Sequence, residues 1–146
     1  YLFEYALDRL PSDNGKRILM QAAFSAVMND VIGDLEVNGF EITKNIEWRQ
    51  LYVKVNPEYV RRIFENLQSN IRRYAERSAD VLVESVFTEK SCGFSFMNTG
   101  SAGRPLIKGT GIGITNVRSM MIEMGGTCSV EETDSVFEIT IMFPIQ

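Results

Sequence analysis

Histidine is absent from this sequence of 146 residues. That absence excludes an imidazole general base, a Ser-His or Cys-His nucleophile pair and most zinc sites. Cysteine is scarce: Cys92 and Cys128 lie 36 positions apart and do not form a CxxC pair. This spacing favours a reduced pair over a disulfide or a metal site. Any chemistry must therefore rest on carboxylates, amides, cations and backbone groups.

Long apolar runs are also lacking, and no run approaches the ~20 residues that span a bilayer. The start of the chain does not resemble a signal peptide. The net charge is -4, whereas a dedicated nucleic-acid surface is normally basic, so we expect no nucleic-acid partner. The length and the hydrophobic content of 45% indicate one globular domain, soluble as given.

The hydrophobic pattern predicts mixed helices and strands after a short N-terminal segment. Residues 1–10 have apolar side chains at helical spacing and 11–15 break that pattern, so we interpret 1–16 as the end of a preceding helix plus a linker, and 17–146 as the domain. Within the domain we expect strands at 17–24, 40–43 and 51–55, helices at 25–37, 56–77 and 114–124, a hairpin of 80–87 with 93–97, a loop at 98–113 and a last hairpin ending at Pro144. Strands outnumber crossovers and follow one another directly. This order predicts an α/β (α+β) two-layer sandwich, with a mixed, mostly antiparallel sheet and helices on one face.

The predicted helix at 56–77 has two stripes. One is apolar and suits the face that packs on the sheet. The other is polar and consists of Asn66, Asn70, Arg73 and Arg77. An amide oxygen can join Mg²⁺ beside phosphates, and an arginine can bind phosphate with two donors. The alternative is that both asparagines are exposed or bond locally.

A glycine-rich segment, Lys108-Gly109-Thr110-Gly111-Ile112-Gly113, runs into the last predicted helix. Glycines allow the backbone to approach a ligand closely, and N–H groups at a helix start attract anions. The alternative is an ordinary loop. A Walker loop is absent, and a Rossmann GxGxxG motif would follow the first strand. A protein kinase of the HRD and DFG type would need a histidine and a longer chain.

Together these segments resemble the histidine-kinase branch of the ATPase family shared with DNA gyrase, Hsp90 and MutL. Residues 64–74, FENLQSNIRRY, are similar to its N box, usually NLxxNAxxY with a basic residue before the aromatic one. Residues 109–113, GTGIG, are similar to its G2 box. Gly125-Gly126, a hairpin and Phe143-Pro144 are similar to its usual end. The resemblance covers about residues 17–146 and implies a Bergerat-type ATP-binding fold.

The resemblance implies a role for each matched position. Asn70 would be the Mg²⁺ ligand and Asn66 would help to place the triphosphate, so both are expected to be catalytic. Arg73 would contact phosphate, and Tyr74 would pack near the adenine or ribose. The phosphates of ATP would be held by Lys108, Gly109, Gly111 and Gly113.

In gyrase-type ATPases, the residue four before the metal-binding asparagine is usually a glutamate that activates the attacking group. This chain has Asn66 there, and Glu65 is turned away by about 100° around the helix. The resemblance therefore implies phosphoryl transfer to an external nucleophile, rather than ATP hydrolysis by a gyrase-type clamp.

The G1 box, usually DxGxG, matches 98–102 (NTGSA) less closely. Asn98 stands where an aspartate would accept a hydrogen bond from the adenine amino group, and Gly100 follows as the first glycine. An amide oxygen still accepts, but the lost charge costs about 1 kcal/mol. The alternative function is therefore a degenerate nucleotide-binding domain that acts as a docking or regulatory module.

The implied function is that of a protein-histidine kinase, which uses ATP and Mg²⁺ to phosphorylate a histidine outside this chain. The implied partners are the histidine-bearing dimerisation domain of the same protein and a response regulator, and the parent protein would be a homodimer. The implied location is cytoplasmic, in a membrane-anchored bacterial sensor.

Overall fold

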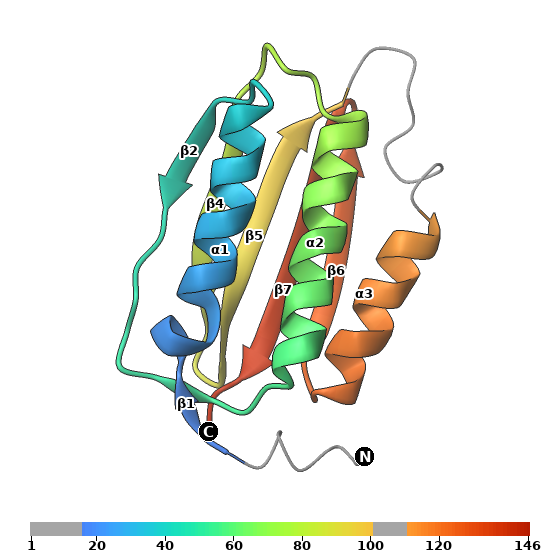
Figure 1. The fold of residues 1–146 in the computed structure, drawn as a ribbon. Coiled ribbons are helices and arrows are strands. Elements are labelled where there is room, and N and C mark those ends of the chain that lie inside the picture. The colour runs from blue at the N-terminus through green and yellow to red at the C-terminus, as the bar shows by residue number, and fades with distance from the viewer. Residues whose placement is uncertain (1–15, 101–110) are drawn as a thin grey trace.

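A computed structural model describes residues 16–100 and 111–146. Figure 1 shows helices side by side on one face of a five-stranded sheet, which confirms the predicted two-layer sandwich. The predicted N-terminal helix end and most of the linker, residues 1–15, lie outside the described residues. None of the helices described is both long enough and apolar enough to cross a membrane. In chain order the elements are β1 (Ile18–Leu19), α1 (Met20–Val37), β2 (Ile42–Asn45), β3 (Tyr52–Val53), α2 (Pro57–Tyr74), β4 (Val81–Phe87), β5 (Ser91–Thr99), α3 (Gly111–Glu123), β6 (Thr127–Thr133) and β7 (Val136–Pro144).

The sheet has the strand order β2-β4-β5-β7-β6. β2 runs parallel to β4, because the chain between them crosses the sheet through α2. The other neighbouring strands are antiparallel, so the predicted mixed and mostly antiparallel sheet is confirmed. β3 does not pair with β2 but with β1, and these two form a separate small sheet.

Aromatic rings fill the space between the two layers. The ring centroid of Phe24 on α1 lies 5.3 Å from that of Phe94 and 4.7 Å from that of Phe143. Phe64 on α2 lies 6.0 Å from both Phe94 and Phe96, in edge-to-face contacts. All five side chains are buried. Edge-to-face pairs add about 0.5–1.5 kcal/mol each to the burial of the rings, so this cluster fixes α1 and α2 on the sheet.

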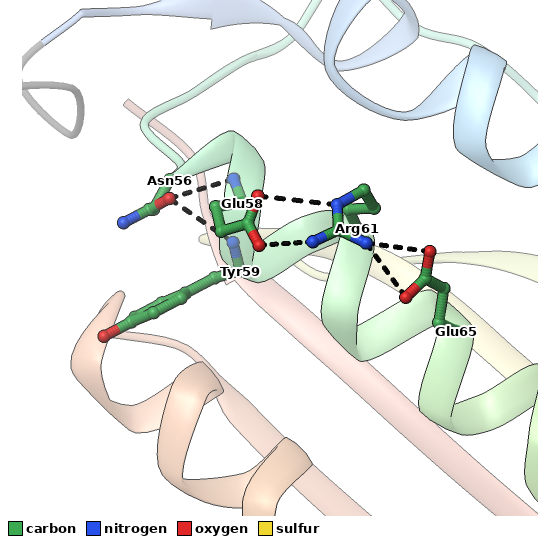
Figure 2. Close-up of polar contacts among 5 residues, drawn as sticks. All are labelled: Asn56, Glu58, Tyr59, Arg61 and Glu65. Carbon is green, nitrogen blue, oxygen red and sulfur yellow. Dashed lines mark hydrogen bonds and ion pairs between the residues drawn. The ribbon is translucent and has the colours of Figure 1, made fainter.

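The start of α2 follows from its sequence. The side chain of Asn56 accepts hydrogen bonds from the backbone N–H groups of Glu58, at 3.0 Å, and Tyr59, at 3.3 Å (Figure 2). Proline occupies the first helical position, where its missing N–H costs nothing. The predicted helix start is confirmed, and it sets which residues of α2 face the sheet.

Replacing Asn56 with alanine is expected to lower the free energy of unfolding by about 1 kcal/mol. Alanine leaves the N–H groups of Glu58 and Tyr59 without their side-chain acceptor. Urea denaturation followed by circular dichroism measures the change. Asn56→Asp keeps an acceptor oxygen and should retain most of the stability, so an equal loss in both variants would contradict the capping role.

The main differences from the predicted elements concern three segments. The predicted strand at 17–24 is mostly the first turn of α1, because its methionine, glutamine and alanines favour helix and only Ile18–Leu19 pairs with β3. The predicted loop at 98–113 is shorter at both ends: β5 continues through Thr99 along β7, and α3 begins at Gly111. α2 ends at Tyr74 instead of continuing to Arg77, because Ala75 is already extended and paired with Gly100.

Candidate functional site

The polar stripe of α2 contains a buried amide. Asn70 is 6% exposed, and its Oδ1 has no hydrogen-bond partner in the structure as described. Asn66, one turn earlier, is half-buried. Native proteins pair nearly all their buried polar atoms, and an unpaired one costs about 1–3 kcal/mol. The alternative that Asn70 is exposed is therefore wrong, and its free oxygen is suited to a ligand.

Two arginines of the predicted stripe have different surroundings. Arg73 is exposed, and its guanidinium carbon lies 5.9 Å from the ring centroid of Tyr74, which is half-buried against the core. Arg77 instead donates from Nε to the carbonyl oxygen of Asn38 at 3.0 Å and lies over the ring of Phe40 at 4.8 Å. Arg77 thus secures the chain after α1 and does not continue the stripe.

A second unpaired amide lies on the central strand β5. Side chains two positions apart on a strand point to the same face, so Asn98 continues the row of Phe94 and Phe96, which packs under the helices. Asn98 is 2% exposed, and neither its Oδ1 nor its Nδ2 has a partner among the residues described. An aromatic row that ends in a buried, unpaired amide indicates a polar ligand group at this end of the core.

The backbone joins the elements that contain the two amides. Ala75 and Gly100 form an antiparallel bridge, and the N–H of Glu76 donates to the carbonyl oxygen of Thr99 at 2.7 Å. The N–H of Gly100 donates to the backbone carbonyl oxygen of Ser135, in the β6–β7 turn, at 2.6 Å. Figure 1 shows the resulting arrangement, in which the C-terminal end of α2 lies beside the end of β5. The stripe of α2 and the Asn98 side chain therefore belong to one end of the molecule.

Helix α3 lies beside α2 and runs in the opposite direction (Figure 1). A hydrogen bond joins α2 and α3 near the start of α2, where the Tyr59 hydroxyl donates to the Glu123 carboxylate at 2.7 Å. Going back from Glu123 to Gly111 covers about 18 Å of helix, and going from Tyr59 to Asn70 covers about 17 Å. The start of α3 is therefore near the level of Asn70. The first N–H groups of a helix have no acceptor within the helix and lie at the positive end of its dipole, so phosphate can bind at this end of α3.

The predicted glycine loop is described only in part. Gly111 and Gly113 lie in the first turn of α3, so they are helical and not part of a loop. A helix can begin there despite glycine's poor propensity because α3 packs against α2, β6 and β7. Lys108 and Gly109 lie outside the described residues. Gly100, predicted as a nucleotide-binding glycine, is buried in the bridge to Ala75.

The structure adds one relation that the sequence analysis missed. Nothing in the local pattern shows that the end of α2 pairs with the end of β5, since Ala75 and Gly100 are far apart in the chain. A local signal did exist for the burial of Asn98, because it follows Phe94 and Phe96 at strand spacing. The loop predicted at 98–113 follows instead from the glycine-rich composition of that stretch and its lack of periodicity.

Both cysteines are free and buried, which confirms the predicted reduced pair. Burial raises the pKa of the Cys92 thiol to about 11. Burial also raises the pKa of Cys128, against the smaller opposing effect of Arg118. Both thiols therefore stay protonated near neutral pH and belong to the core.

Comparison with known proteins points to one class. No family model matches the chain. The sensor histidine kinase YrkQ of Bacillus subtilis (strain 168) is 25% identical over 129 residues, which cover 86% of this chain and 30% of YrkQ. The chain thus spans less than a third of the length of that relative.

Solved structures give the same result for the fold. The catalytic domain of histidine kinase ThkA has a TM-score of 0.70 at 14% identity, covering 88% of this chain and 95% of that one. The mycobacterial sensor histidine kinase MprB has a TM-score of 0.69 at 15% identity, with coverages of 90% and 99%. The Acinetobacter baumannii histidine kinase AdeS has a TM-score of 0.68 at 16% identity, covering 90% of this chain and 67% of that one. The resemblance found in the sequence is confirmed: this chain is similar to a sensor histidine kinase over most of its length and has the fold of histidine-kinase catalytic domains.

Proposed function

We propose that residues 17–146 are the ATP-binding catalytic domain of a sensor histidine kinase, which transfers the γ-phosphate of ATP to a histidine that this chain does not contain. The observation that supports this most strongly is the pair of buried amides at one end of the domain, Asn70 and Asn98, whose Oδ1 atoms have no hydrogen-bond partner among the described residues. One is on the helix that resembles the N box, and the other is at the position that would meet the adenine. Native proteins rarely leave such groups without a hydrogen-bond partner, and a bound nucleotide with its Mg²⁺ would supply one to each.

The residues present suit Mg²⁺-ATP. Asn70 Oδ1 is a neutral, hard oxygen of the kind that Mg²⁺ accepts beside phosphates and water, and it is free. Bound Mg²⁺ would neutralise charge on the triphosphate. Asn66 and Arg73 would orient the phosphates from the same face of α2, and the first N–H groups of α3, with Gly111 and Gly113, would bind phosphate oxygens. Lys108 and Gly109 are proposed to complete this set.

The residues of α2 support transfer to an external nucleophile. Glu65, the carboxylate nearest in sequence to Asn66, lies on the exposed side of the helix. Both of its oxygens accept from Arg61, at 3.0 and 2.9 Å (Figure 2). It is therefore turned away from Asn70 and is already paired. The chain's own contribution is to position ATP and balance its charge, and the accepting imidazole brings its own nucleophilicity.

The same proposal assigns roles to the N-terminal residues, to the partner proteins and to the cellular location. Residues 1–16 would be the end of a dimerisation helix plus a linker, and the histidine would lie in that dimerisation domain of a homodimeric parent protein. A response regulator would receive the phosphoryl group. The domain would be located in the cytoplasm, in a membrane-anchored sensor.

Binding of ATP is the first test. Calorimetric titration of the intact protein with Mg²⁺ and a non-hydrolysable ATP analogue is expected to give a Kd of about 1 mM or tighter, since a neutral amide replaces the usual carboxylate at the base. Arg61→Ala is the matched control, because Arg61 lies on α2 and its ion pairs within the described part of the chain are with Glu58 and Glu65. It should bind as the wild type does. Absence of binding at millimolar analogue would contradict the proposed kinase.

A further inference from the structure

The Asn98 side chain offers a ligand both a donor and an acceptor. Its Nδ2 and Oδ1 are buried and lack partners throughout the described part of the chain. An amide is satisfied fully only by a group that accepts from Nδ2 and donates to Oδ1. A carboxylate at this position would be an acceptor on both oxygens. The chemical difference between asparagine and aspartate is therefore largest for a ligand edge that has one donor and one acceptor side by side.

Purines have such an edge, and the order of its donor and acceptor depends on the substituent at the 6-position. A 6-amino purine such as adenine presents an N–H donor at the 6-position next to the N1 acceptor. A 6-oxo purine such as hypoxanthine or guanine presents the O6 acceptor next to the N1–H donor. An amide matches the first order in one orientation and the second order after a half-turn of its terminal torsion. The carboxylate oxygen that faces the 6-position accepts from an amino group there, but meets another acceptor when O6 takes its place.

The surroundings of Asn98 do not select either orientation. Its neighbours along the same face are Phe96 on β5 and Phe137, its register partner on β7, and both are apolar. No hydrogen bond from a described residue reaches Nδ2 or Oδ1. The two orientations therefore differ little in energy before a ligand is bound, and the ligand selects between them.

We propose that Asn98 makes this site tolerant of the purine 6-substituent, so that it binds inosine and guanosine triphosphates about as well as ATP. This inference rests on the proposed function, because it assumes that a nucleotide base reaches Asn98. Asn98 is then the specificity-determining residue of the site. An aspartate there would favour 6-amino purines, because its oxygen at the 6-position would repel O6.

Competition against a fluorescent ATP analogue, at pH 8 with Mg²⁺ and the intact protein, tests the proposal. The competitors are ATP, ITP and GTP, and ITP differs from ATP only at the 6-position and N1. We expect the Kd of ITP to lie within about tenfold of that of ATP. In Asn98→Asp, ATP should bind as well or better, and ITP should weaken by at least about tenfold relative to ATP, because two acceptors then face each other.

A wild-type preference for ATP of more than about tenfold would overturn the proposal, as would an Asn98→Asp variant that weakens both nucleotides equally. Melting temperatures without nucleotide show whether the variant folds. If it does not, Asn98→Ala is used, which should weaken ATP and ITP by similar factors, and selective loss of ATP binding would again overturn the proposal. If the fluorescent analogue does not bind at all, that result contradicts the proposed kinase function. If ATP binds and ITP does not, the result contradicts only the proposed tolerance at Asn98.

Discussion

Replacing Asn70 with alanine is expected to reduce transfer of the ATP γ-phosphate by at least about a hundredfold, the usual loss when one preorganised electrostatic contact to the reacting phosphate is removed. Asn70 is 6% exposed, and its Oδ1 has no hydrogen-bond partner among the described residues. This oxygen is therefore available as the proposed Mg²⁺ ligand. Asn70→Asp should fail as well, because it adds a negative charge beside the triphosphate. Under the proposed function, labelling of the acceptor histidine in the full-length parent protein, from ATP radiolabelled at the γ-phosphate, measures the effect.

The matched control for this prediction is Ser69→Ala. Ser69 is the preceding residue on α2 but is exposed, about 100° around the helix from Asn70. Its loss should leave phosphotransfer within about twofold of the wild type, since exposed substitutions rarely matter. Because the buried Oδ1 of Asn70 has no partner to lose, the melting temperature should stay near that of the wild type. Retained activity in Asn70→Ala would exclude Asn70 from the metal site, and equal losses in Asn70→Ala and Ser69→Ala would indicate a general defect of α2.

The parts of the fold that the sequence predicted are those with local causes. The start of α2 depends on Asn56 and the proline after it, and its buried face depends on the spacing of apolar residues within the same helix. The same periodicity placed Asn66 and Asn70 together on one side. These signals act over a few residues and do not need the rest of the chain.

The parts that the sequence did not predict depend on distant segments. Asn98 becomes a strand residue because β5 pairs with β7, where its partner is Phe137. α2 ends at Tyr74 because Ala75 pairs with Gly100, and this takes Arg77 out of the polar stripe. Tertiary pairing thus overrides the local preferences of asparagine for loops and of this segment for helix. The same two pairings bring the end of α2 and Asn98 to one end of the domain, and no local pattern predicts this arrangement.

Gly93 is expected to tolerate no side chain at all. It lies in β5, between β4 and β7, where its register partners are Val86 and Met142. A Cβ atom at this position would lie 1.8 Å from the carbonyl oxygen of Ile141 and 2.8 Å from the Cα of Met142. These are backbone atoms of the neighbouring strand, so no rotamer change removes the overlap. Gly93→Ala should lower the free energy of unfolding by about 3 kcal/mol, at the upper end for overpacking.

Gly33→Ala is the matched control, because it makes the same chemical change in a different environment. Gly33 lies in the interior of α1, where a Cβ would meet no heavy atom within 4 Å. Alanine restricts the unfolded chain and favours helix, so this variant should be more stable than the wild type by up to about 1 kcal/mol. Urea denaturation gives the free energy of unfolding of both variants, provided that its dependence on urea concentration has the same slope as in the wild type. Opposite signs for the two variants would tie the effect to the β5–β7 contact. A stable Gly93→Ala protein would mean that β7 can move away from β5, and the placement of Asn98 at the end of that strand pair would then lose its support.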